Sequence, residues 1–292
     1  MRGCERHILA AVDAPFFELF AVCAVVAAVC WVLSITTREY SWVDRIWSIA
    51  PPCYVGFVAM RAGFADARLN VVAVLTAAWG IRLTYNFARR GGYRPGGEDY
   101  RWAVLRQRLG PRNFQIFNAV FVAPFQNALL LLLAAPAHTM WQHRGRPLSA
   151  IDIALVALFV AFLVGETVAD GQQWAFHRRK AELAAQRGAE VGETGSRGFL
   201  DAGLFRYSRH PHYFCEMGMW WTIYGFAVAA SGQWLHWTIA GPVLLTLLFQ
   251  GTSRFTEELS LAKYPAYAEY QRTTSRLVPL PPRRWTLVGR RE

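Results

Sequence analysis

Apolar residues of this 292-residue chain fall in long blocks that short polar segments separate. A membrane-spanning helix needs roughly 20 mostly apolar residues, because the hydrocarbon core is about 30 Å thick and each helical residue rises about 1.5 Å. The blocks that reach about this length are Phe16–Thr36, Trp42–Met60, Leu69–Phe87, Phe114–Ala135, Ile151–Asp170, Tyr213–Ala230 and Trp234–Gly251. We therefore expect an all-α, polytopic membrane protein with about seven transmembrane helices, built as one domain over residues 1–292.

The positive charge borders these blocks and so predicts an orientation. The chain has a net charge of +11, and 22 of its 31 Lys and Arg lie after the third block, after the fifth block or in the C-terminal tail. In a seven-span protein these three segments share one side, and basic loops favour the cytoplasm. The pattern predicts an outside N-terminus and a cytoplasmic C-terminus. It also argues against nucleic-acid binding as the reason for the basic charge.

Two shorter helices and one turn-rich loop are expected outside the blocks. In residues 98–110, the spacing of apolar positions predicts an amphipathic helix at the membrane interface, with Trp102, Leu105 and Leu109 on one face. Residues 256–271 predict a helix that is broken near Pro265. The stretch Gly188–Gly198 contains four glycines and indicates turns.

Several common chemistries are missing from the sequence. The five Cys residues have no paired spacing, so neither a disulfide framework nor a zinc pattern follows. Neither a GxGxxG nor a GxxxxGK[ST] motif is present. A nucleotide would have to be held by helix ends and arginines.

Ionisable residues inside the apolar blocks need a partner or a purpose, because each costs at least about 2.5–3.5 kcal/mol on insertion. Helical spacing places Arg82, Tyr85 and Arg89 on one face, and likewise pairs His212 with Glu216. A polar cavity open to the cytoplasm would explain such stripes. For any single residue, snorkelling or a structural ion pair, such as Asp44 with Arg82, is an alternative explanation. The convergence of the stripes on one side favours the cavity. The residues concerned are Asp44, Arg45, Arg82, Asn86, Glu166, Asp170 and Glu216.

The segment Gly203–Glu216, GLFRYSRHPHYFCE, carries the densest candidate chemistry. It offers cationic donors and hydrogen-bonding hydroxyls immediately before Pro211, which suits the first turn of a helix. Arginines before a helix N-terminus favour an anionic phosphate. A basic loop touching anionic lipid headgroups is the alternative. His210 and His212 lack a third ligand, so no metal site is expected.

This segment and EELSLAKYPAYAEYQRTTSRLVP, about forty residues later, resemble the C-terminal domain of the steroid 5α-reductase family. SWVDRIWS, WGIRLTYNFARR and GGEDYRW further resemble its bacterial branch labelled DUF1295, so the resemblance covers roughly residues 40–282. It implies a seven-helix membrane oxidoreductase that binds NADPH in a cavity open to the cytoplasm. Residues 1–110 would then carry substrate-side groups, and residues 111–292 the cofactor-binding loops and tail.

The resemblance also assigns roles to individual residues. Tyr85 matches the tyrosine that polarises the substrate carbonyl, and Asp44 is the candidate for the acid that orients it. The expected cofactor-binding residues are Asp170, Arg206, Tyr207, Ser208, Arg209, His210, His212, Glu216, Arg254, Glu257 and Tyr264. Two positions depart from the family pattern, with His212 in place of Asn and Cys215 in place of Gly. Either change would alter cofactor affinity or mark a relative without reductase activity.

The expected reaction is hydride transfer from NADPH to the β-carbon of an α,β-unsaturated carbonyl in a steroid-like or other lipid. A buried donor at the developing oxyanion is worth about 3–4 kcal/mol, the role expected of Tyr85. Isoprenylcysteine-type membrane methyltransferases, which use S-adenosylmethionine, carry similar C-terminal motifs and remain an alternative, as does a non-catalytic relative. Alanine- and arginine-rich usage predicts a bacterial plasma (inner) membrane. Membrane lipids and a lipid-like substrate are the expected partners; oligomeric state stays open.

Overall fold

The computed structural model describes residues 15–187 and 197–283, and these are mostly helical. No β-strand occurs in the described segments, where one isolated bridge joins Ser208 to Ser275. The all-α class is therefore confirmed. The chain forms two compact units, one made of residues up to Val160 with Trp220–Leu245, the other of Ala161–Met219 and the residues from Thr246 on.

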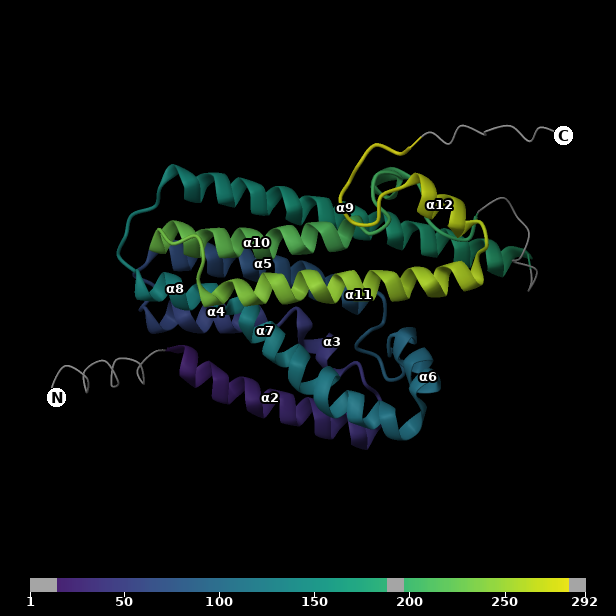
Figure 1. Ribbon diagram of the computed structural model, residues 1–292, viewed down its shortest axis with the longest axis horizontal. Coiled ribbons are helices and arrows are strands. Elements are labelled where there is room, and N and C mark those ends of the chain that lie inside the picture. Colours follow the sequence, from purple (N-terminus) through teal and green to yellow (C-terminus); the bar gives the residue numbers. More distant parts are fainter. Residues whose placement is uncertain (1–14, 188–196, 284–292) are drawn as a thin grey trace. The chain divides into compact units, whose positions relative to one another are not determined.

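The helices follow one another along the chain as Figure 1 labels them. Three of them, α9, α10 and α11, contribute residues to both units. The elements are α2 (Pro15–Thr37), α3 (Trp42–Trp47), α4 (Ala50–Arg61), α5 (Ala67–Arg89), α6 (Tyr100–Phe117), the π-helix η1 (Asn118–Phe125), α7 (Gln126–Ala134), α8 (Pro136–Gln142), α9 (Ala150–Arg187), the 3-10 turn η2 (Gly203–Arg206), α10 (Pro211–Ser231), the 3-10 turn η3 (Trp237–Ile239), α11 (Ala240–Lys263) and α12 (Tyr267–Thr273).

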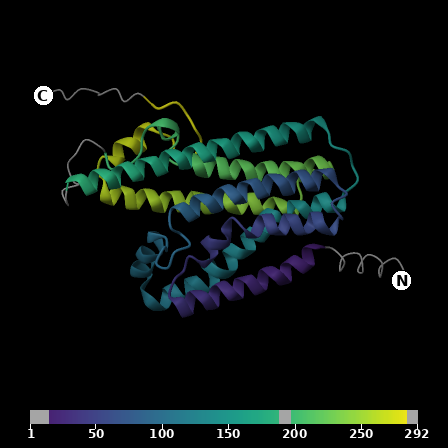
Figure 2. The same ribbon diagram turned by 180° about the vertical axis from the view of Figure 1, so that it is seen from behind.

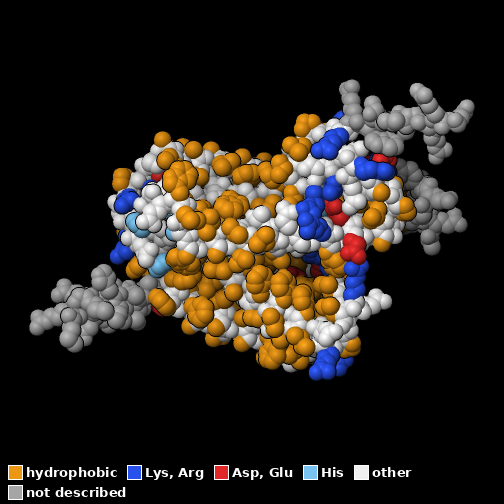
Figure 3. All heavy atoms as spheres, viewed as in Figure 1, with side chains coloured by type: hydrophobic (Ala, Val, Ile, Leu, Met, Phe, Trp, Pro, Cys, Tyr) orange, Lys and Arg blue, Asp and Glu red, His pale blue; other side chains and the backbone are white. Residues whose placement is uncertain are grey.

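In the first unit α4 packs against α5 and α7, and α2 lies beside α7 and η1, as Figures 1 and 2 both show. Hydrophobic side chains cover much of the visible face of these helices (Figure 3). A buried ion pair fixes one end of the unit, where Arg68 donates to both oxygens of Asp152 at 2.7 and 2.9 Å. The side chain of Asp66 caps α5 by accepting from the Leu69 amide at 2.9 Å.

Four helical segments of the described chain are long and apolar enough to cross a membrane: Pro15–Thr37, Ala67–Arg89, Tyr100–Gln142 and Ala150–Gln186. This marks the chain as a membrane protein. The count of about seven is not reached, because three expected blocks fall short of these measures. Trp42–Met60 is split between α3 and α4, and the blocks at 213–230 and 234–251 form α10 and part of α11, which do not meet them.

The amphipathic helix expected at 98–110 is present as the start of α6, which Asp99 caps by accepting from the Arg101 amide at 2.9 Å. Part of its apolar face is covered, although Leu109 is exposed. Trp102 is buried in a cluster with Tyr40, Phe114 and Val122, and Leu105 packs against that cluster. The helix expected at 256–271 is likewise present, and Pro265 separates α11 from α12.

Candidate functional site

The basic loop that precedes α10 lies in the second unit and is shaped by two close approaches. Gly203 has a φ of +64°, and a Cβ there would lie 2.5 Å from the side chain of Gln172. That side chain accepts from the Leu204 amide at 2.9 Å, so it ties the loop to α9. Pro211 then begins α10, where its missing N–H leaves no bond unmade. The loop thus reaches the helix with His210 as its last residue.

The C-terminal tail runs alongside this loop and is bonded to it through the backbone. The amide of Arg209 donates to the Ser275 carbonyl at 2.8 Å, and the amide of His210 to the Arg276 carbonyl at 3.0 Å. The buried Ser208 hydroxyl donates to the Leu277 carbonyl at 2.7 Å. Ser208, expected to bind a cofactor, therefore serves to hold the tail.

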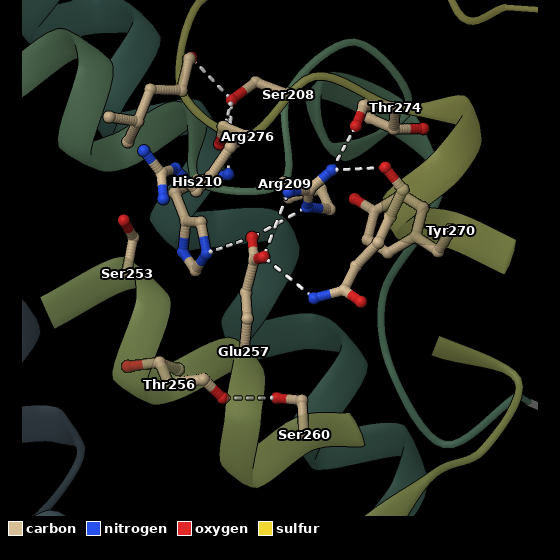
Figure 4. Close-up of polar contacts among 12 residues, drawn as sticks. Ser208, Arg209, His210, Ser253, Thr256, Glu257, Ser260, Tyr270, Thr274 and Arg276 are labelled. Carbon is tan, nitrogen blue, oxygen red and sulfur yellow. Dashed lines mark hydrogen bonds and ion pairs between the residues drawn. The ribbon is translucent and has the colours of Figure 1, made fainter. Parts of the chain in front are cut away.

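Arg209 and Glu257 form the centre of the cluster that Figure 4 shows. The guanidinium donates from Nε and from Nη2 to the two oxygens of Glu257 at 2.7 and 3.0 Å. Its remaining nitrogen, Nη1, donates to the carbonyls of Gln271, at 2.9 Å, and of Thr274. One side chain thus joins the loop, α11 and the tail. We call these contacts the Arg209 clamp.

Two further donors complete the coordination of Glu257. His210 Nε2 lies 3.0 Å from Oε1, and Gln271 Nε2 donates to Oε2 at 3.0 Å. The imidazole of His210 also stacks on the Tyr213 ring, with centroids 5.4 Å apart, and Tyr213 stacks on Phe249 at 4.4 Å. His210 and Glu257 are both buried, so the arrangement is held on several sides.

The cluster contains more cationic side chains than carboxylates. Burial by itself would raise the pKa of Glu257, but the hydrogen bonds from His210 and Arg209, the Arg209 charge and the Gln271 bond lower it to about 2. Burial and the neighbouring charge of Arg254 lower the pKa of Arg276. Neither Arg254 nor Arg206 forms an ion pair with any residue of the described segments, and both are exposed. In the segments that the structure describes, the Arg276 guanidinium donates to the neutral Gln250 side chain. Cationic groups are therefore in excess here.

Tyr264 lies in a different setting, next to two lysines. Its hydroxyl accepts from Lys180 Nζ at 2.7 Å, and the ring fills the space where a Cβ on Gly198 would be. Gly198 has a φ of +78°. Of the expected Gly188–Gly198 turn, positions 188–196 lie outside the described residues. Partial burial opposes the shift, but the Lys180 bond and the lysine charges lower the pKa of Tyr264.

The remaining expected cofactor residues of this unit occupy varied positions. Asp170 and Glu216 are buried, on α9 and α10, and His212 is half-buried with its ring 4.3 Å from Tyr213. Tyr207 is 44% exposed. Cys215, where the family pattern has Gly, meets a glycine of α9, since a Cβ on Gly165 would lie 2.9 Å from its sulfur. The extra bulk is thus accommodated by helix packing.

The proposed substrate-side residues, Asp44 and Tyr85, both lie in the first unit. Asp44 accepts from the indole nitrogen of Trp102 at 3.0 Å. Tyr85 is 65% exposed, and its ring lies 5.6 Å from the guanidinium carbon of Arg89. Asp44 therefore joins α3 to α6, and its role beside Tyr85 stays a prediction.

Sequence reasoning missed the tail residues that complete the site: Gln271, Thr274, Arg276 and, on α11, Gln250. Three of these lie within the stretch EYQRTTSR, which carries part of the family resemblance, so the motif itself was the available signal. Over residues 15–187 and 197–283 no group of three or more His, Cys, Asp or Glu side chains could hold a metal ion.

Comparison with known proteins identifies a family to which the chain belongs. The model of a family described as "Protein of unknown function (DUF1295)" matches residues 30–274. The chain belongs to the DUF1295 family. An uncharacterized protein of Schizosaccharomyces pombe is 35% identical over 285 residues, covering 94% of this chain and 83% of the relative. No solved structure matches the chain. Because this DUF1295 relative is fungal, membership of the family does not itself indicate a bacterial membrane.

Proposed function

We propose that this DUF1295 protein is a membrane reductase that binds NADPH and reduces an activated C=C bond in a steroid-like or other lipid enone. The observation that carries the proposal is the excess of guanidinium groups around the Arg209 clamp. Arg209 is paired with Glu257, whereas Arg206, Arg254 and Arg276 form no ion pair with a carboxylate among the described residues, and the Glu257 charge only partly offsets the arginine charges at Arg276. An anionic ligand at this place would relieve their mutual repulsion.

The residues present fit a phosphorylated cofactor. Guanidinium groups bind phosphate through paired, charge-assisted hydrogen bonds, and arginine is the preferred residue for this contact. Arg254 and Arg276 lie close enough for the charge of one to lower the pKa of the other. We assign the phosphates of NADPH to these two arginines, with Arg206 at the exposed edge of the loop.

When bound, NADPH supplies a hydride equivalent. The overall reaction adds that hydride to the β-carbon of the enone and a proton to its α-carbon, giving the saturated carbonyl compound and NADP⁺. The Tyr85 phenol would donate a hydrogen bond to the carbonyl oxygen as negative charge develops there, an assignment that rests on the family resemblance.

The membrane arrangement completes the proposal. Four candidate spans together with α3–α4, α10 and the first part of α11 would give seven crossings. The positive-inside rule then places the basic loop before α10 and the tail in the cytoplasm, where NADPH is available. The alanine- and arginine-rich composition supports a bacterial plasma membrane as the location.

Binding and turnover by the purified full-length protein test the proposal. NADPH should bind, and Arg254→Ala or Arg276→Ala should each weaken its binding at least several-fold, whereas Arg178→Ala, which removes an exposed arginine of α9, should not. Tyr85→Phe should abolish enone reduction while NADPH binding stays within a few-fold. Binding of S-adenosylmethionine in place of NADPH would overturn the reductase in favour of a methyltransferase. Binding of neither would favour a non-catalytic protein.

A further inference from the structure

Glu257 has no hydrogen-bonding capacity left for a ligand. An ionised carboxylate offers about four acceptor sites, two on each oxygen. Oε1 accepts from Arg209 Nε and His210 Nε2, and Oε2 accepts from Arg209 Nη2 and Gln271 Nε2. The side chain is also only 5% exposed. Whatever binds beside the cluster therefore does not bind to Glu257.

The contact with the Glu257 carboxylate also determines which nitrogen of His210 carries the proton. An ionised carboxylate can only accept, so the short contact to Glu257 requires a hydrogen on Nε2. In the neutral imidazole the other nitrogen, Nδ1, then holds the lone pair. A carboxylate that fixes the tautomer and orientation of an imidazole is a familiar device in enzymes.

We infer that Glu257 is a positioning residue, which Arg209 and Gln271 clamp so that it keeps the proton of neutral His210 on Nε2 and leaves Nδ1 as an acceptor for the ligand. The identity of that ligand as NADPH rests on the proposed function. The hydrogen-bonding role of His210 does not, because it follows from the contacts of the cluster alone.

The contacts of His210 fix the orientation of its ring, and the polar groups near Nδ1 indicate what kind of ligand group could bind there. The ring stacks on Tyr213, and its backbone amide is bonded to the Arg276 carbonyl at 3.0 Å, so a flipped ring would lose the Glu257 bond. Figure 4 shows the Arg276 guanidinium and the Ser253 hydroxyl on the side of the imidazole away from Glu257. An acceptor nitrogen close to a guanidinium suits a ligand group with both a donor and an acceptor, such as a carboxamide.

Nitrogen-15 NMR of the full-length protein, labelled at histidine and held in detergent micelles, tests the tautomer directly. The His210 resonances are identified by their loss in His210→Gln. We expect neutral His210 to be protonated at Nε2 and unprotonated at Nδ1. Glu257→Gln should shift it to a mixture of tautomers, because the amide cannot accept from all four donors. Glu258→Gln, on the next residue of α11 and exposed, should leave the spectrum unchanged.

NADPH titration of the same proteins separates this inference from the proposed function. Glu257→Gln should weaken binding about tenfold, the loss expected for one misdirected hydrogen bond, and Glu258→Gln less than twofold. Wild-type protein protonated at Nδ1 would overturn the inference, a result that requires no variant at residue 257 to fold. Equal NADPH binding by wild type and Glu257→Gln would also overturn it, while leaving the reductase proposal intact. The expected tautomer in a protein that does not bind NADPH would uphold the positioning role and reject the cofactor.

Discussion

Replacing Arg209 with alanine should release the C-terminal tail from the loop before α10. The substitution removes the two bonds to Glu257 and those to the Gln271 and Thr274 carbonyls, but it keeps the backbone amide that donates to Ser275. It also leaves the Glu257 carboxylate buried without its guanidinium. Removing one partner of a buried ion pair costs about 3–5 kcal/mol.

Hydrogen exchange of the tail measures that cost. Amides of the tail and loop are bonded across the clamp, with Leu280 donating to Tyr207 and His210 to Arg276, both at 3.0 Å. A loss of about 3 kcal/mol from the closed state corresponds to local exchange faster by about a hundredfold. Peptides covering residues 273–283 should show it, whereas peptides from α2 in the first unit should not.

Two variants of the same loop make this test selective. Arg206→Ala removes an exposed arginine that has no ion-pair partner in the described segments, so exchange should stay within a few-fold of wild type. Arg209→Lys keeps the charge but not the forked geometry, and it should give an intermediate result. If Arg209→Ala and Arg206→Ala exchange at the same rate, the clamp does not hold the tail and the reasoning is refuted.

Two further predictions concern ionised groups. The pKa of Glu257 falls from its ordinary 4.5 to about 2 on folding, so this group contributes stability above about pH 4.5 that is lost as the pH drops towards 2. The loss should approach about 3 kcal/mol in pulse-labelled exchange of the tail, and Glu257→Gln should flatten this pH dependence. In the first unit, Arg68→Ala should cost about 3–5 kcal/mol in thermal or denaturant unfolding, because it strands the buried Asp152. The exposed pair Arg178–Glu182 should contribute less than about 1 kcal/mol, and equal costs for the two pairs would contradict the burial argument.

Helices that follow one long, mostly apolar block were predictable to within a few residues. The block Phe16–Thr36 became α2, Pro15–Thr37, and Leu69–Phe87 became α5, Ala67–Arg89. Such runs contain no strong helix breaker, and burial in lipid or protein rewards the same residues that define them. Length was less predictable where polar residues extend a helix, as in α9, which continues past Asp170 to Arg187.

The second apolar block is split by a pair of prolines, a signal that hydropathy alone does not detect. Residues 42–60 are apolar enough to read as one span, yet α3 ends at Trp47 and α4 begins at Ala50. Pro51 and Pro52 explain the break, because proline lacks an N–H and clashes with the preceding turn, and it is tolerated only at the start of a helix. The paired prolines start α4 and shorten it to 12 residues.

The site could be predicted by residue type but not by partner. Arginine, histidine and glutamate in two separated motifs indicated a polar site, and Arg209, His210 and Glu257 do converge. Their contacts join residues 47 or more positions apart, and no local periodicity specifies such pairs. Asp44 is a second example: its residue type suited catalysis, but no local pattern indicated that its carboxylate accepts a hydrogen bond from Trp102, 58 residues away.

The hydrogen-bond partners of each residue therefore distinguish structural residues from candidates for ligand binding in this protein. Arg209, Glu257 and Ser208 have their hydrogen-bonding groups directed at one another or at backbone carbonyls, so substituting them would first change the loop and tail. Arg206 and Arg254 have charge but no ion-pair partner among the described residues, so substituting them would change an anion's affinity while leaving the fold nearly intact. Suppose that substituting Arg206 or Arg254 weakens ligand binding with the fold intact, and that substituting Arg209, Glu257 or Ser208 disrupts the loop and tail. The binding surface would then lie at the exposed edge of the cluster.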